Sequence, residues 1–145
     1  MSVTEAEYLD LWEERHRSGV VPPVQKRMGI SLDQLSPTTV LTMALSDDVR
    51  GPVEGSVHGG MLATFADVAS AVALWNCYED DSESPVTTDM HVRYYRQPNS
   101  GPLKAEATVV HRGRRLLSTE CSIADAAGRV LSRSTATYML VPRTF

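Results

Sequence analysis

Apolar residues are spaced in two different ways along this chain, and each spacing predicts a different kind of element. Between Gly59 and Tyr78 the sequence is apolar on almost every side of a helix and carries one formal charge, Asp67. A helix of that composition is a buried one. A spacing of three or four residues predicts its core face, which would hold Met61, Phe65, Val68, Val72 and Trp75, flanked by Leu62 and Ala69. Asp67 argues against a membrane span, because a carboxylate at bilayer depth costs about 2.5 kcal/mol or more.

After the helix, apolar and polar residues alternate, which predicts four β-strands. In the first of them one face would carry Thr87, Asp89, His91, Arg93 and Tyr95, and the other Val86, Thr88, Met90, Val92 and Tyr94. The remaining three are expected at 103–109, 117–123 and 130–141, with two shorter strands before the helix at 28–35 and 38–46. A long helix followed by antiparallel strands predicts an α+β domain in which the sheet wraps the helix.

The beginning of the chain predicts a short extra helix over residues 4–17. Thr4 and Glu7 have the spacing of a capping box, in which each side chain bonds the other's backbone N–H. An extended linker would follow this helix. We therefore expect an N-terminal helix and linker over residues 1–23 and a single domain over residues 24–145.

The composition is that of an ordinary soluble enzyme or binding protein. The 145 residues carry a net charge of −4, and no basic block suggests nucleic acid as a partner. The polar, acidic N-terminal segment differs from a signal peptide, so we expect a cytoplasmic protein without a membrane partner. Cys77 and Cys121 lack the spacing of metal ligands, and we expect both to be buried thiols and no metal site.

The candidate catalytic groups lie at the start and in the middle of the long helix. Two glycines after His58 would let a ligand approach the free N–H groups of the first turn, and the helix dipole there suits a developing oxyanion. Asp67 is either a structural carboxylate satisfied by nearby donors or a functional acid. Gly59 and Asp67 would lie about 12 Å apart on one helix. They serve one reaction only if two copies of the helix meet or another group completes each site.

Two stretches of this sequence carry a family resemblance. His58-Gly-Gly-Met-Leu-Ala-Thr-Phe-Ala-Asp67 and the later Val86-Thr-Thr-Asp-Met-His-Val-Arg-Tyr-Tyr-Arg-Gln-Pro98 resemble the hotdog-fold acyl-CoA thioesterases of the PaaI-like (phenylacetate-pathway) type. The similarity covers roughly residues 28–141. It implies a hotdog fold, a homodimer or homotetramer, and hydrolysis of an acyl-CoA. Coenzyme A would be part of the substrate, and no separate cofactor is expected.

The resemblance also implies a role for each matching residue. The Gly59 N–H would bind the thioester oxygen, and Asp67 of the neighbouring subunit would act as base or nucleophile. Thr87 would place a hydroxyl near the attacking water. His58 would support the loop and the oxyanion site, and Gly60 would contact the substrate. Asp89, on the face expected for Thr87, is interpreted as a structural hydrogen-bonding residue.

A basic cluster between two predicted strands is the candidate site for coenzyme A phosphates. Arg112, Arg114 and Arg115 lie close together there, and the guanidinium fork suits phosphate. A solvated charged hairpin is the other interpretation of the same residues. The family commonly has basic residues near this turn, which favours phosphate contact.

One position departs from the family pattern. Relatives usually carry Asn or Gln six residues before the histidine, where this chain has Pro52. Either Glu54 or Ser56 takes over, the loop is shifted, or the site is weaker or tuned to another substrate. An acyl-CoA-binding hotdog domain without turnover is therefore the alternative function, and a hydratase or dehydratase on the same fold is a third. The acyl group stays open between aromatic, short-chain and medium-chain types.

Overall fold

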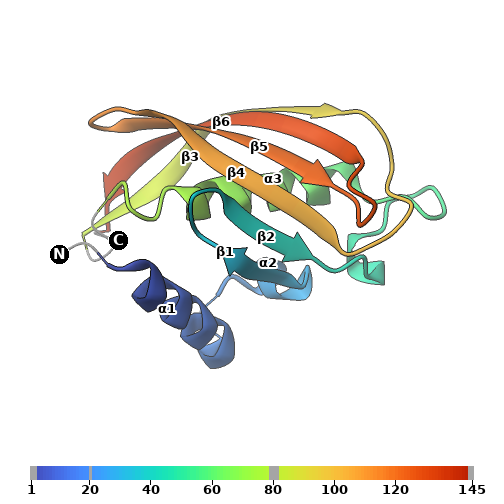
Figure 1. Cartoon of the computed structure of the whole chain (residues 1–145), viewed down its shortest axis with the longest axis horizontal. Coiled ribbons are helices and arrows are strands. Elements are labelled where there is room, and N and C mark those ends of the chain that lie inside the picture. Colours follow the sequence, from blue (N-terminus) through green and yellow to red (C-terminus); the bar gives the residue numbers. More distant parts are fainter. Residues whose placement is uncertain (1–2, 20, 79–81, 144–145) are drawn as a thin grey trace.

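The computed structural model describes residues 3–19, 21–78 and 82–143. Figure 1 shows a curved sheet that passes in front of one long helix, with a second helix set to one side. The elements in chain order are α1 (Glu5–Ser18), α2 (Pro23–Arg27), β1 (Ile30–Gln34), β2 (Thr39–Met43), η1 (Asp47–Val49), α3 (Gly59–Ala73), β3 (Glu83–Tyr94), β4 (Leu103–Arg112), β5 (Leu116–Ala124) and β6 (Val130–Pro142).

One antiparallel sheet holds all six strands, in the order β1-β2-β4-β5-β6-β3, and α3 packs on its inner face. The expected α+β arrangement, a helix wrapped by an antiparallel sheet, is confirmed. The helix is shorter than expected, because it ends at Ala73 and Trp75 lies beyond it. Its buried face is also rotated, and holds Leu62, Phe65, Ala66, Ala69, Ser70, Val72 and Ala73, while Met61 and Val68 stay partly exposed. Alanines on this face let the strands approach the helix closely.

A β-bulge in β3 corrects the predicted faces of that strand. Thr87 is paired with Tyr138, whereas Asp89 is paired with the preceding residue of β6, Thr137, so Thr88 is an extra residue in the ladder. Directly opposed residues of an antiparallel pair point to the same face. Thr87 therefore faces α3 with the buried Tyr138, and Asp89 faces outward. The prediction that these two side chains share a face is wrong, because alternation cannot detect an inserted residue.

The N-terminal helix is confirmed with its capping box, and Gly19 ends it in the left-handed conformation at φ 75°. The prediction of an extended linker up to residue 23 is wrong for its last residue, because α2 begins at Pro23. Proline is well suited to the first turn of a helix. The acidic stretch after the long helix, residues 79–84, would suit a solvated loop, but it is only partly described: residues 79–81 lie outside the described residues, and residues 83 and 84 belong to β3.

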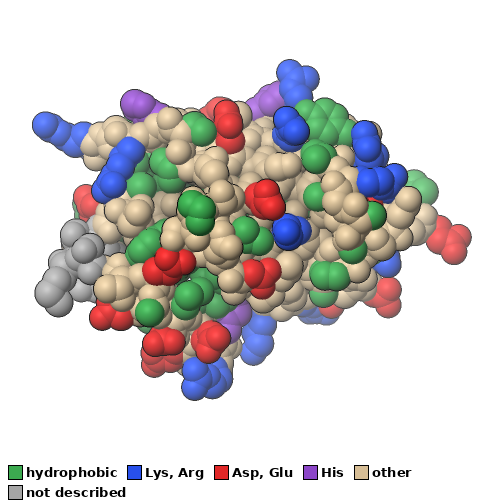
Figure 2. Space-filling view, viewed as in Figure 1, with side chains coloured by type: hydrophobic (Ala, Val, Ile, Leu, Met, Phe, Trp, Pro, Cys, Tyr) green, Lys and Arg blue, Asp and Glu red, His purple; other side chains and the backbone are tan. Residues whose placement is uncertain are grey.

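Side chains of α1 contact the body of the protein without being fully covered. Tyr8, Leu9 and Trp12 pack against the core, and the rings of Tyr8 and Trp75 are 5.9 Å apart. The expected burial of the thiols holds for Cys121 and is wrong for Cys77, which is partly exposed beyond the end of α3. Acidic and basic side chains are interspersed on the face in Figure 2. Among the helices of the described residues, none is long and apolar enough to cross a membrane.

Candidate active site

Asp67 is held from two neighbouring strands at the middle of α3. The Thr87 hydroxyl on β3 donates a hydrogen bond to Asp67 Oδ1 at 2.8 Å, and the Tyr138 hydroxyl on β6 donates to the same oxygen at 2.7 Å. A carboxylate oxygen has about two lone-pair sites, so these two donors fill Oδ1. Oδ2 has no hydrogen-bond partner within the described part of the chain. We call these three residues the Asp67 cluster.

Tyr138 is a site residue that the sequence analysis missed. Its side chain is 1% exposed. Burial raises the pKa of its hydroxyl above the ordinary range, and the Asp67 carboxylate raises it further, so Tyr138 stays protonated and donates at neutral pH. Its inward position follows from the alternation of the last strand. Its contact with Asp67, however, joins residues 71 positions apart and follows only from the packing of α3 on β6.

The N-terminus of α3 leaves one backbone donor without a partner. The Gly60 N–H donates to His58 Nδ1 at 3.0 Å, and the N–H groups of Met61 and Leu62 reach the His58 carbonyl at 2.9 and 3.2 Å. The Leu62 bond is the first regular bond of the helix. Of the four N–H groups that a helix start leaves unpaired, those of Gly60 and Met61 are satisfied by His58, and that of His58 donates to the Val49 carbonyl at 2.9 Å. In the described residues nothing accepts the fourth, that of Gly59. The Gly59 N–H is therefore the one without an acceptor among these groups of the described chain, whereas the Gly60 N–H is already bonded to His58.

Two residues from the end of β3 and the loop after it hold the backbone next to Gly59, and the sequence analysis missed both. The Tyr94 hydroxyl donates to the Gly59 carbonyl at 2.8 Å, and Gln97 Oε1 accepts the Val57 N–H at 2.9 Å. Ser56 donates its hydroxyl within the turn, to the Val53 carbonyl at 2.5 Å. Thus an amide does reach this loop despite Pro52, and it comes from a position that is distant in sequence.

One chain brings together only part of the predicted site. Asp67 and Thr87 are in contact, whereas Gly59 begins the same helix about 12 Å away at 1.5 Å per residue. Asp89 lies exposed on the opposite side of the sheet from Thr87. No side-chain hydrogen bond is found for Asp89 in the described segments, so its expected structural bonding is not seen. A reaction that uses both Gly59 and Asp67 requires a second copy of α3.

Arg112 lies at the end of β4, on the same side of the sheet as the Asp67 cluster, and Arg114 and Arg115 follow it in the turn to β5. Arg112 donates to the carbonyl of Asn76 at 3.0 Å, and Arg114 and Arg115 are exposed in the β4–β5 turn. Arg112 begins a cross-strand row that continues through Leu117 and Tyr138 to Thr87. Three strand spacings separate the ends of this row, or about 14 Å.

Neither cysteine supplies a nucleophile to this site. Burial raises the pKa of Cys121 to about 12, which keeps the thiol protonated at neutral pH. Burial also raises the pKa of Cys77, an effect that nearby Arg112 partly opposes. No group of three or more histidine, cysteine or acidic side chains that could hold a metal ion occurs among residues 3–19, 21–78 and 82–143.

Known proteins share both this sequence pattern and this fold. The profile of the Thioesterase superfamily matches residues 54–132, more than half of the chain. The proofreading thioesterase EntH of Klebsiella pneumoniae is 31% identical over 75 residues, covering 52% of this chain and 54% of its own. A Halobacterium salinarum protein named only as a candidate esterase is 38% identical over 79 residues, covering 54% and 52%. The matches thus span about half the length of these curated relatives.

The fold itself matches over the full chain. A thioesterase structure from Haemophilus influenzae superposes with a TM-score of 0.81, at 19% identity, covering 100% of this chain and 95% of its own. At that identity the likeness establishes the architecture alone. The expected hotdog fold is confirmed by this match together with the six-stranded sheet around α3.

Proposed function

The chain belongs to the thioesterase superfamily, and from this premise we propose that it is an acyl-CoA thioesterase of the PaaI-like type. The reaction would convert an acyl-CoA and water into a free acid and coenzyme A. The proposal rests on two groups that occur on one helix. One is the Asp67 carboxylate, which has one oxygen without a hydrogen-bond partner, and the other is the Gly59 N–H, which has no acceptor in the described residues. These are the two parts that thioester hydrolysis requires: a base or nucleophile and an oxyanion donor.

Strand β3 is the basis for proposing a site shared between two subunits, because it contacts both Asp67 and Gly59. Thr87 contacts Asp67, and Tyr94, later on the same inner face, contacts Gly59. β3 is also an edge strand, paired only with β6 in this chain. Antiparallel pairing with β3 of a second subunit, centred near Met90, would set Thr87 of one chain across from Tyr94 of the other. Asp67 of one subunit would then face Gly59 of its neighbour in a homodimer; a homotetramer would hold two such dimers.

In the proposed mechanism the thioester carbonyl oxygen accepts the Gly59 N–H and Asp67 Oδ2 faces the carbonyl carbon. As a base, Asp67 would take a proton from water while the water oxygen adds to the carbon; the C–S bond then breaks and the proton passes to the coenzyme A thiolate. As a nucleophile, Oδ2 would add to the carbon and expel the thiolate, and water would hydrolyse the resulting anhydride. Thr87 supports Asp67 in both routes and can accept a hydrogen bond from the water.

The basic residues support coenzyme A as the carrier of the acyl group. Arg112 lies in the cross-strand row that ends at Thr87, about 14 Å away by strand spacing, and the flexible pantetheine arm separates the thioester from the phosphates. Arg114 and Arg115 are exposed beyond it and free to meet phosphate. Replacing both by glutamine should raise KM for an acyl-CoA and leave kcat unchanged.

Hydrolysis is tested by following free thiol with a panel of aromatic and aliphatic acyl-CoAs. Wild-type turnover that falls by about 10²–10⁴ in Asp67→Asn supports the proposal, because asparagine keeps an acceptor for Thr87 and Tyr138 but cannot serve as base. Single turnover in ¹⁸O-water tests the nucleophilic route, since solvent oxygen enters Asp67 only when water cleaves the anhydride at its aspartyl carbonyl. Binding of acyl-CoA without thiol release would favour the alternative, a non-catalytic acyl-CoA-binding domain, which Pro52 motivates.

The shared site is tested by mixing two inactive variants. Gly59→Pro lacks the N–H, and Asp67→Asn lacks the carboxylate. A mixed dimer would hold one site with both groups intact, so equal amounts refolded together should regain about a quarter of wild-type activity if dimers form at random. No recovery, with mixed dimers detected by native mass spectrometry, would contradict a site built from two chains.

A further inference from the structure

We propose that Gln97 is a positioning residue that aims the Gly59 N–H, an inference that rests on the function proposed above. Gln97 lies in the connection between β3 and β4. Its Oε1 accepts the backbone N–H of Val57 at 2.9 Å. Val57 is two residues before Gly59, so this bond fixes the backbone directly before the oxyanion donor.

The loop that leads to Gly59, residues 50–58, is held mainly by bonds within itself, among them Arg50 to the Gly55 carbonyl and Ser56 N–H to the Val53 carbonyl; we call it the oxyanion loop. Two backbone bonds close its base: Gly51 donates to the Ser56 carbonyl at 3.0 Å and His58 donates to the Val49 carbonyl at 2.9 Å. Val57 is 2% exposed, and a buried N–H without an acceptor is costly. Gln97 supplies that acceptor from outside the loop.

Tyr94 completes the arrangement from the other side of His58. Its hydroxyl donates to the Gly59 carbonyl at 2.8 Å. The peptide that joins His58 to Gly59 is therefore held on both sides. Gln97 bonds the Val57 N–H before it, and Tyr94 bonds the Gly59 carbonyl after it. Both fixing side chains come from one short segment at the end of β3. The orientation of the Gly59 N–H is thus set by that segment, as well as by the helix it begins.

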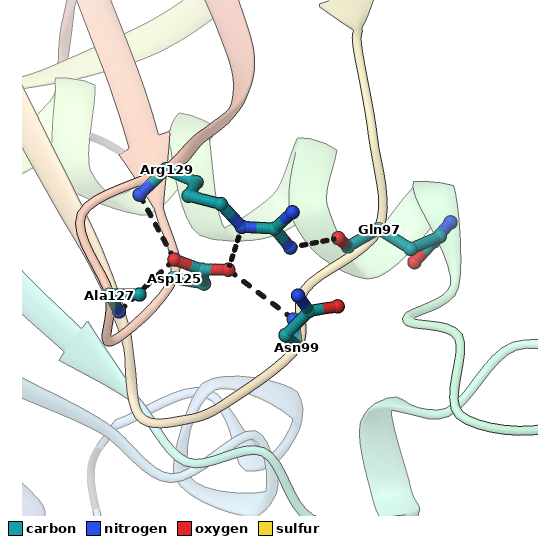
Figure 3. Close-up of polar contacts among 5 residues, drawn as sticks. All are labelled: Gln97, Asn99, Asp125, Ala127 and Arg129. Carbon is teal, nitrogen blue, oxygen red and sulfur yellow. Dashed lines mark hydrogen bonds and ion pairs between the residues drawn. The ribbon is translucent and has the colours of Figure 1, made fainter.

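The backbone of Gln97 is itself held by a polar network centred on the buried Asp125, drawn in Figure 3. Arg129 donates to the backbone carbonyl of Gln97 at 3.2 Å, and its Nε donates to Asp125 Oδ2 at 3.0 Å. The Asp125 side chain is fully buried and also accepts the N–H groups of Ala127, Arg129 and Asn99 at 3.1, 3.0 and 3.3 Å. The β5–β6 turn therefore fixes the backbone of Gln97 through Arg129, and the Gln97 side chain in turn fixes the oxyanion loop at the Val57 N–H.

A backbone donor depends on this support more than a side chain does, because no rotamer change can correct its aim. Misplacement of a reacting group by about 1 Å can cost on the order of 10²-fold in rate. The oxyanion forms only on the way to the transition state, so a misaimed donor lowers kcat and leaves substrate binding largely unchanged. This division between kcat and KM separates positioning from general support of the fold.

The test compares two replacements of similar size. Gln97→Met has no acceptor, whereas Gln97→Glu keeps one for the Val57 N–H. We expect Gln97→Met to lower kcat about tenfold with KM within twofold of wild type, and to speed hydrogen exchange at the Val57 amide. Gln97→Glu should restore most of kcat and the protection of that amide. Tyr94→Phe should also lower kcat, and the two losses should not be additive, because both residues fix the same peptide.

Two results would overturn the inference. One is a wild-type kcat in Gln97→Met when the Val57 amide exchanges faster, which would mean that the bond exists but does not aim the donor. The other is a lowered unfolding temperature with unchanged kcat in the folded fraction, which would mean that Gln97 only supports the fold. Turnover that requires Asp67 upholds the proposed function in both cases, whereas absence of turnover in the wild type overturns both proposals.

Discussion

The start and the middle of α3 hold reactive groups in opposite ways. At the middle, Asp67 is a side chain held by two other side chains, and both supports bond the same oxygen. At the start, the donor is the backbone N–H of Gly59, and its supports bond the peptides on either side of it. A side chain can re-aim by rotation, whereas a backbone group can be aimed only by fixing the loop. The comparison predicts that the middle tolerates loss of one support better than the start does.

Among the variants that leave Asp67 in place, the largest effect is expected at the start of α3, from removing the donor itself. Proline suits the first position of a helix, and His58 already has the extended conformation that proline requires before it, with φ −63° and ψ 128°. Gly59→Pro should therefore fold and lose about 10²–10³ in kcat, measured by thiol release.

Gly59→Ala is the matched control for that variant. Its added Cβ would meet the Tyr94 ring at 3.6 Å, an ordinary contact, and the N–H stays in place. Alanine should therefore retain far more kcat than proline. Equal losses in the two variants would contradict the role of the N–H and would point to close approach of the substrate as the reason for glycine.

A smaller effect on rate is expected at the middle, where Thr87→Val removes one of two donors to Asp67. We expect kcat to fall about threefold, less than the tenfold loss expected for Gln97→Met, because Tyr138 still bonds Asp67. The free energy of unfolding should change by less than about 0.5 kcal/mol, because the side chain is exposed. Thr87→Ser keeps the hydroxyl and should retain most of the activity. A loss as large as that of Gly59→Pro would reverse the comparison.

Tyr138→Phe removes the other donor and should be visible mainly in stability. Loss of a hydrogen bond to a carboxylate should lower the free energy of unfolding by about 1.5–3 kcal/mol at neutral pH. The pKa of Tyr138 is raised on folding, so its contribution is complete below the unfolded pKa of about 10 and is lost as the pH rises above it. Denaturant unfolding from pH 8 to 11 should therefore show a smaller decline in Tyr138→Phe than in wild type.

The smallest effect is expected in the pH dependence of stability, from Asp125 behind Gln97. Burial raises the pKa of Asp125, but hydrogen bonds from Arg129 and Asn99 and the Arg129 charge lower it by more, for a net decrease. A lowered folded-state pKa gives stability that is complete above about pH 4 and is lost as the pH falls further. Thermal unfolding between pH 5 and 3 should therefore change less in Asp125→Asn. An identical acid response in both proteins would contradict this coupling.

Most of the architecture was predictable because periodicity reports burial directly. The alternation of β5 placed Leu117, Cys121 and Ile123 on the buried face, and all three are there. The apolar periodicity did not predict α2 or the extra residue in β3. The reactive candidates, Gly59 and Asp67, were found from local chemistry and family resemblance, whereas their supports were not.

The supports could not be predicted because each acts across the fold. Gln97 is 40 residues from the Val57 amide it accepts, and Tyr94 is 35 residues from Gly59. Each belongs to a residue type that is ordinary at the surface of a strand or loop. Only the pairing of β3 with β6, and the position of the following loop beside the start of α3, gives these side chains a specific partner.

The bulge in β3 makes the length of the chain at this point as important as its side chains. Met90 and the residues after it are fixed against β6, so the extra residue at Thr88 decides which way Thr87 points. A regular ladder that kept Thr88 would pair Thr88 with Tyr138 and turn Thr87 to the outer surface, although every side chain would be retained. Deletion of the Thr88 codon would instead remove the bulge and leave Thr87 opposite Tyr138, so this deletion should be tolerated better than a one-residue deletion that shifts the register elsewhere in the strand. Comparisons among variants should treat insertions and deletions in this strand as changes to the site itself.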